Sequence, residues 1–185
     1  IYAKGRAYDA MNSNPQKTID YYSQAAALYA TMPDKKIKAL YIKHLVAHGY
    51  DKVRDSSNCV KILKELYNEI LPIPDSIKIK MRFMVEMGLI STVVKNYTFA
   101  DSIFHHLTKR EWIVNDPTEY DYLNHYLLAK AKISVLQHRQ YNSPYIDSLE
   151  NIFATSRNSS DSMFYSNELW ELYKAMGNKT KENFF

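Results

Sequence analysis

The sequence predicts an all-α protein built from antiparallel helical hairpins, and three observations support this. A capping side chain precedes proline at Asn14-Pro15, Asp116-Pro117 and Ser143-Pro144, which is a typical helix start. Between such starts the apolar residues recur at helical spacing, and no segment shows the sustained alternation of a strand. Glycine, which the turns of all-β folds use heavily, occurs four times in 185 residues.

The first half of the chain contains four expected helices. Pro33 and Pro72 each follow an apolar-periodic run and should end it, because proline cannot continue a helix. Gly49 is expected as the left-handed residue that closes a helix. One apolar stripe marks the buried face of the fourth helix: Ile62, Leu63, Leu66, Tyr67 and Ile70. We expect helices over 1–12, 15–31, 35–48 and 56–71.

The second half contains five more helices by the same criteria. Asp116 and Glu119 have the spacing of a capping box, which predicts a helix start at Pro117. Gly177 is expected as a left-handed C-cap. We expect helices over 75–95, 98–111, 117–139, 144–156 and 160–176, with a tenth beginning near Lys179. Because the connections are short, consecutive helices should be antiparallel neighbours.

A repeat of about 41 residues relates these helices. The middle residues of the first helix in each pair are separated by 41, 42, 41 and 41 positions: Gly5, Val46, Gly88, Ala129 and Trp170. Three of the five are glycine or alanine, as expected where two helices approach closely. A single hairpin cannot cover its own apolar stripe, so neighbouring hairpins should stack.

The best unit has Gly88 in its first helix and Ala100-x3-Phe104 in its second. This pattern resembles the tetratricopeptide repeat (TPR), W-x2-L-G-x2-Y followed by A-x3-F and proline. Val46 and Trp170 stand where a small residue is usual, Trp112 stands where proline is usual, and the standard period is 34. The positions assigned to helix packing by the resemblance are Gly5, Tyr8, Tyr22, Gly88, Tyr97, Ala100, Phe104, Ala129, Tyr173 and Gly177.

The resemblance implies a TPR-like α-α superhelix, a single array over 1–185. Its hairpins would cover 1–33, 34–73, 74–114, 115–157 and an incomplete 158–185. A plain irregular helical bundle is the alternative fold. Ile1 opens inside a helical pattern and the last two residues, Phe184 and Phe185, are apolar. We therefore expect a piece of a longer array, or an end on which both phenylalanines fold back as a cap.

Catalytic, metal-binding and cofactor-binding patterns are absent from the sequence. His44 and His48 have metal-ligand spacing on a helix, but Leu45 stands where a zinc protease has glutamate. Cys59 is the only cysteine and has no histidine beside it. No phosphate-binding glycine loop or nucleophile elbow occurs. We expect no enzyme, no metal and no cofactor, with a helical-bundle enzyme as the more distant alternative.

The charge distribution leaves one other class open. The net charge is +4 and acidic residues interleave with the basic ones, whereas nucleic-acid binding predicts a continuous basic stripe. A nucleic-acid-binding helical repeat is therefore the alternative, and no nucleic acid is expected as partner. No run of eighteen apolar residues is present, so we expect no membrane contact by this segment.

The function implied by the TPR resemblance is protein–protein interaction or scaffolding. In TPR proteins the first helices line a concave groove that receives a peptide or a helix. The same register assigns the following residues to that groove: Tyr2, Arg6, Lys43, Arg82, Tyr126, Lys130 and Asn167. Four of these are cationic, as in TPR proteins that clamp a peptide carboxylate. We expect a protein or peptide partner, and a sensing segment of a larger regulatory protein, extracytoplasmic or cytoplasmic.

Overall fold

The computed structural model describes residues 1–11, 14–74, 78–107, 120–156 and 159–185, and within these ranges it contains helices and no strand. The prediction of an all-α fold is confirmed. The helices are α1 (Tyr2–Met11), α2 (Pro15–Ala30), α3 (Lys36–Lys52), α4 (Ser56–Ile70), α5 (Lys78–Val93), α6 (Tyr97–His105), α8 (Tyr120–Lys132), α9 (Pro144–Thr155), α10 (Ser159–Ala175) and α11 (Lys179–Glu182). A 3₁₀ turn, Pro33–Lys35, precedes α3, and a π-helical turn, Ile133–Gln137, follows α8.

The helix starts follow the capping chemistry of the sequence. The side chain of Asn14 accepts a hydrogen bond from the backbone N–H of Lys17 at 3.0 Å, directly before Pro15. Ser143 accepts one from Tyr145 at 3.4 Å before Pro144. These bonds satisfy backbone donors that a helix start leaves without a partner. The expected start at Asp116-Pro117, together with Glu119 and Trp112, lies outside the described residues.

Two expected helix ends differ from the structure. The prediction that Gly49 ends its helix in a left-handed conformation is wrong. Helix α3 continues to Lys52, and the left-handed residue that follows the helix is Arg54, with φ of 59°. Gly49 lies inside the helix because its missing side chain makes room for Ile19. The helix expected over 117–139 also changes at Ile133 into a π-helical turn, in which His138 donates to the Ile133 carbonyl at 3.2 Å. Gly177 does have a left-handed φ, of 69°.

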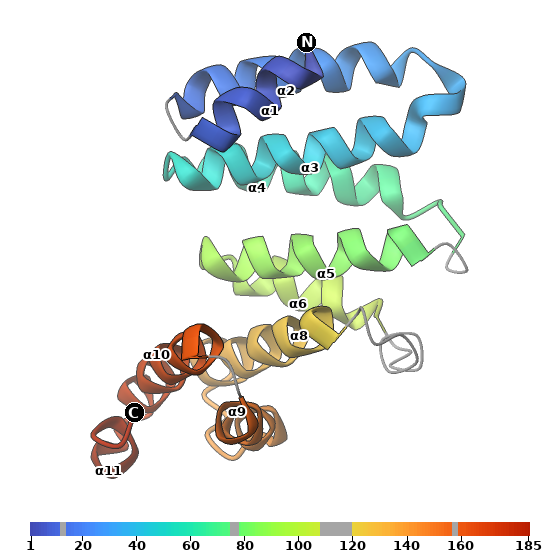
Figure 1. Ribbon diagram of the computed structural model, residues 1–185. Coiled ribbons are helices and arrows are strands. Elements are labelled where there is room, and N and C mark those ends of the chain that lie inside the picture. Colours follow the sequence, from blue (N-terminus) through green and yellow to red (C-terminus); the bar gives the residue numbers. More distant parts are fainter. Residues whose placement is uncertain (12–13, 75–77, 108–119, 157–158) are drawn as a thin grey trace. The chain divides into compact units, whose positions relative to one another are not determined.

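The chain divides into two compact units, Ile1–Val94 and Lys95–Phe185, and each is described by itself. The division falls inside the hairpin expected over 74–114. In the first unit α1 to α5 run back and forth as antiparallel neighbours (Figure 1). Helix α3 packs against α2, α4 and α5. One cluster of buried residues from α2 and α3 joins these two helices: Ile19, Tyr22, Ala25, Ile42 and Val46.

Helix α1 is held on this unit by contacts through Tyr22. A Cβ atom at Gly5 would lie 2.7 Å from Cδ1 of Tyr22, so glycine lets the ring lie against α1. The Tyr22 hydroxyl donates to Asp9 at 3.3 Å, and Lys52 of α3 pairs with the same carboxylate at 2.7 Å. The hydrogen bond from Lys52 holds the pKa of Asp9 below its ordinary value. This network fixes α1 relative to α2 and α3.

A buried lysine closes the connection from α4 to α5. The ammonium of Lys80 donates to the carbonyls of Leu71 and Ile73 at 2.9 and 2.7 Å, and Lys80 is buried. These carbonyls lie just after the end of α4, where backbone acceptors lose their helical partners. Lys80 therefore anchors the start of α5 to the end of α4.

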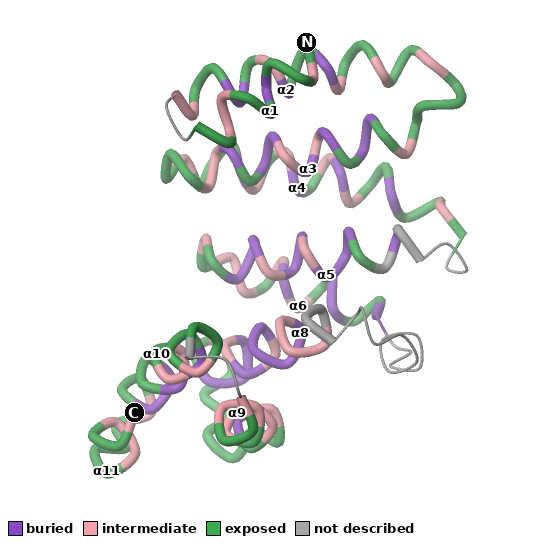
Figure 2. The backbone as a smooth tube through the Cα atoms, viewed as in Figure 1, coloured by how far each residue is buried: buried purple, intermediate pink, exposed green. Residues whose placement is uncertain are grey.

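The second unit contains α6, α8, α9, α10 and α11, with α9 packed against both α8 and α10. Figure 2 shows buried positions along α8. Phe185 stacks on Tyr173 with centroids 5.8 Å apart and meets Phe153 edge-on at 5.2 Å. The Ser166 hydroxyl donates to the Phe185 carbonyl at 3.0 Å. Of the two phenylalanines expected to fold back, Phe185 does so and Phe184 is exposed.

Candidate interaction surface

Side chains from three helices of the first unit meet on one surface. We name it the α1–α3–α5 face and define it by Tyr2, Arg6, Lys38, Tyr41, Arg82 and Glu86. Tyr41 is at its centre, and its ring centroid lies 6.3 Å from that of Phe83 on α5. Tyr41 is 41% exposed, which leaves much of the ring available to a partner.

Charged groups of two other helices act on the Tyr41 hydroxyl. Burial raises the pKa of the Tyr41 hydroxyl, and the charge of Glu86 raises it further. The positive charges of Arg6 and Arg82 act in the opposite direction. Arg6 belongs to α1 and Arg82 to α5, so cations from two different helices act on one tyrosine of a third.

The face carries more positive than negative charge. Lys38 places its ammonium 5.5 Å from the ring centroid of Tyr2 and 4.7 Å from that of Tyr29, which is cation–π geometry. Arg6 and Arg82 are exposed. Against these three cations the defined face has one carboxylate, Glu86. The arrangement combines aromatic area with cations that reach solvent.

His44 lies beneath this face and is buried. Its Nε2 is 3.2 Å from Oε2 of Glu86, and its ring centroid is 6.2 Å from that of Phe83. Within the described residues neither ring nitrogen makes a hydrogen bond of good geometry. Burial lowers the pKa of His44 to about 4, and the charge of His48 adds to the effect. Its imidazole is therefore neutral at pH 7.

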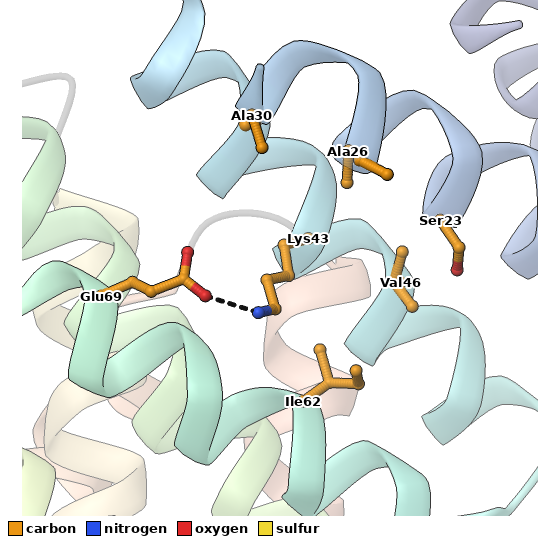
Figure 3. Close-up of a pocket in the computed structure, with 9 residues that line it drawn as sticks. Ser23, Ala26, Ala30, Lys43, Val46, Ile62 and Glu69 are labelled. Atoms are coloured by element: carbon orange, nitrogen blue, oxygen red, sulfur yellow. Dashed lines mark hydrogen bonds and ion pairs between the residues drawn. The ribbon is translucent and has the colours of Figure 1, made fainter. Parts of the chain in front are cut away.

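Lys43 does not share this face, which corrects its expected place in a groove with Arg6 and Arg82. Its ammonium pairs with Glu69 at 2.6 Å (Figure 3) and with Glu65 at 3.0 Å, both on α4. Residues 41 and 43 are two positions apart on a helix, so their side chains point about 160° apart. On α3 it is therefore Tyr41, and not Lys43, that lies on the α1–α3–α5 face.

The remaining groove residues belong to the second unit. Tyr126 is buried and meets Phe104 edge-on, with centroids 5.3 Å apart. Lys130 pairs with Asp101 at 3.1 Å, and His138 approaches the same carboxylate at 3.4 Å. Asn167 is exposed on α10. Lys130 is therefore already engaged by a carboxylate of its own unit.

The residues assigned to repeat packing are spread over both units. In the first unit Tyr8 stacks on Tyr21 with centroids 5.6 Å apart, and Gly88 is buried in α5. In the second unit the Tyr173 hydroxyl donates to Glu150 at 2.7 Å. The other members there, apart from Gly177, are buried or half-buried: Tyr97, Ala100, Phe104 and Ala129.

Nucleophilic and metal chemistry find little support in the described residues. Cys59 is fully buried, and burial raises the pKa of its thiol to about 12, which keeps it protonated and unreactive at neutral pH. His48 approaches Asp51 at 3.9 Å. Over the described ranges no three His, Cys, Asp or Glu side chains are grouped in a way that could hold a metal ion.

Sequence reasoning missed Lys38, Tyr41 and Glu86 on this face. Lys38 and Tyr41 are three positions apart in α3, a spacing that places them on one side of a helix. The sequence carries this spacing, but the side that faces α1 and α5 is set by which residues pack against α2 and α4.

No described helix combines the length and apolarity needed to cross a bilayer.

Comparisons with protein-family models, curated proteins and solved structures gave no significant match. The fold class and the chemistry of the α1–α3–α5 face are therefore the basis for a functional assignment.

Proposed function

We propose that this chain is a protein-interaction module of the TPR type, and that the α1–α3–α5 face binds an acidic segment of a partner protein. The observation that carries the proposal is the approach of three helices around Tyr41. The Tyr41 ring lies 6.3 Å from Phe83 of α5, Lys38 of α3 lies over Tyr2 of α1, and the positive charges of Arg6 and Arg82 act on the Tyr41 hydroxyl. Tyrosine and arginine are enriched among the residues that dominate binding energy at interfaces. Carboxylates form their strongest hydrogen bonds with such cations.

The TPR assignment rests on the repeat spacing and the motif residues, supported by back-and-forth helices in the first unit (Figure 1). Within this proposal the chain acts as the sensing or assembly segment of a larger regulatory protein. The partner is recognised through acidic side chains or a carboxylate, with Arg6 and Arg82 as charged contacts. Tyr41 supplies apolar area and a hydroxyl between them.

The test begins with capture of partners on the full chain, followed by affinity measurement with the purified partner. Replacing both arginines, Arg6→Gln with Arg82→Gln, should weaken binding about thirtyfold or more, since each truncated hot-spot residue costs about 1 kcal/mol or more. The matched control removes two exposed cations outside the face, Lys36→Gln with Arg54→Gln, and should bind within about twofold of the parent chain. Isothermal titration calorimetry at two salt concentrations measures both.

The salt series and a nuclease control separate the alternatives. An acidic partner should bind more weakly at high salt but remain detectable, because aromatic contacts are not screened. Equal loss of affinity in the arginine pair and the control pair would contradict the proposed face. Capture of nucleic acid alone, lost at high salt, would replace the proposal with the nucleic-acid-binding alternative.

A further inference from the structure

The N-caps of four helices recur at 41 residues or twice that spacing. Each cap is an asparagine or aspartate whose side chain accepts a hydrogen bond from the backbone N–H three positions later, at 3.0 to 3.3 Å. They begin α2, α4, α6 and α11: Asn14, Asp55, Asn96 and Asn178. The intervals between them are 41, 41 and 82 positions. The second helix of a hairpin therefore begins at the same point of the period four times.

The residue before three of these caps has the same left-handed backbone conformation. These residues are Arg54, Lys95 and Gly177, with φ of 59°, 60° and 69°, and position 13 lies outside the described residues. Two of the turns also share a backbone hydrogen bond. The N–H of Asp55 donates to the Tyr50 carbonyl at 2.9 Å, and that of Asn178 donates to the Tyr173 carbonyl at 3.0 Å. Such a bond belongs to a Schellman turn, which closes the preceding helix.

The first helices carry a buried residue nine positions before each of these caps. With one residue of α8, these positions form a series at exact intervals of 41: Gly5, Val46, Met87, Leu128 and Leu169. The last three precede by one position the residues that the sequence suggested, Gly88, Ala129 and Trp170. All five members of the new series are buried, whereas Trp170 is 37% exposed. Caps and burial therefore give the same register.

The second helices repeat a pair of core residues after the cap. Four positions after it a small residue is buried: Thr18, Cys59 and Ala100. Eight positions after it a large residue is buried: Tyr22, Leu63 and Phe104. Positions four apart lie on one side of a helix, so α2, α4 and α6 present the same small-then-large pair to the core.

We infer that the chain is built from five copies of one 41-residue helical-hairpin repeat, in which the turn and its Asn or Asp cap set where the second helix begins. The fourth copy departs from the pattern. Its expected cap, Gln137, lies in the π-helical turn, and α9 begins after Ser143, six positions later. Leu169 and Asn178 return to the common register.

The repeat also relates residues of the α1–α3–α5 face. Tyr41 and Arg82 each lie fourteen positions before a cap, and Phe164 has this position in the fifth copy. All three are exposed. The face thus uses one position of the repeat twice. The inference does not depend on an acidic partner, and failure of that proposal would leave it standing.

A segment exchange within the full chain tests the register. Residues 55–66 of copy two are replaced by the sequence of residues 96–107 of copy three. The control inserts residues 95–106 instead, which displaces the cap by one position and puts His106 in the place of the fully buried Leu66. The in-register chain should keep a cooperative urea transition with at least about two thirds of the parental midpoint, and the displaced chain should lose it. Circular dichroism follows unfolding, and hydrogen exchange of α2 and α3 peptides assigns it to the first unit.

A pair of double variants tests the core positions with smaller changes. Cys59→Ala with Leu63→Phe gives copy two the residues of copy three. Cys59→Phe with Leu63→Ala has the same composition in reversed order and should lower the urea midpoint at least about twofold more. Equal losses in the two double variants would overturn the inference, as would a displaced chain as stable as the in-register one.

Discussion

Gly49→Leu is expected to lower the free energy of unfolding of the first unit by about 3 kcal/mol, near the upper end of overpacking costs. A Cβ atom at position 49 would lie 2.7 Å from Cγ1 of Ile19. Ile19 is buried in the α2–α3 cluster, so its branched side chain has little space to move. The higher helix propensity of leucine offsets about 1 kcal/mol at most.

Hydrogen exchange of the full chain, followed by mass spectrometry, checks this prediction. Peptides from α2 and α3 should lose protection in Gly49→Leu, because local exchange reports the stability of each region. The matched control is Ala7→Leu, a leucine at an exposed position of α1, and its α2 and α3 peptides should keep the parental protection. Parental protection in Gly49→Leu itself would show that α2 and α3 are not packed closely at this position.

Acid should destabilise the first unit through His44. The unfolded chain takes up a proton at this histidine near pH 6.5, whereas burial delays uptake in the folded chain to about pH 4. Between these values the unfolded state binds more protons, so the free energy of unfolding falls as the pH falls. The full shift corresponds to about 3 kcal/mol. The nearby carboxylate of Glu86 offsets part of it, and we expect a loss of about 1–3 kcal/mol.

His44→Met isolates this contribution, because it keeps an apolar side chain of similar size and cannot be protonated. Urea unfolding of the full chain at pH 7 and pH 4.5 should show a smaller drop in stability for His44→Met than for the parent. Carboxylates such as Asp9 titrate in both chains and cancel in the comparison. His48→Gln, at a more exposed histidine, should retain most of the parental drop. A parental drop in His44→Met would assign the acid sensitivity to other groups.

The helices could be predicted from the sequence because local rules set them. The caps at Asn14 and Ser143 satisfy backbone donors within three residues, and no distant contact is needed to place them. The end of α3 could not be predicted in the same way. Gly49 has the local properties of a C-cap, but the packing of Ile19 against it keeps it inside the helix, and that contact spans thirty positions of sequence.

The candidate site was less predictable for the same reason. Arg6 and Arg82 were assigned from the repeat spacing, and in the structure the charges of both act on Tyr41. Lys43 does not lie with them. The repeat of 41–42 residues sets the position along a helix only to within a residue or two, and each residue rotates the side-chain direction by about 100°, so the face on which a residue lies is not determined by the repeat alone.

The position of α1 connects the fold to the proposed function. Asp9 accepts hydrogen bonds from Tyr22 of α2 and Lys52 of α3, and Gly5 admits the Tyr22 ring. These contacts set the rotation of α1, which in turn places Arg6 within electrostatic reach of Tyr41. The helix from which Arg6 extends is thus held in place by core packing.

Site-specific photo-crosslinking from position 41 shows whether a partner docks on the α1–α3–α5 face. A benzophenone amino acid replaces Tyr41 in the full chain, and Tyr141, a similarly exposed tyrosine of the second unit, carries it in the control. We expect a crosslink from position 41 to an acidic segment of a captured protein, reduced when Arg6 and Arg82 are also replaced, and little adduct from position 141. Adducts to that protein from position 141 alone would contradict a binding role for the α1–α3–α5 face.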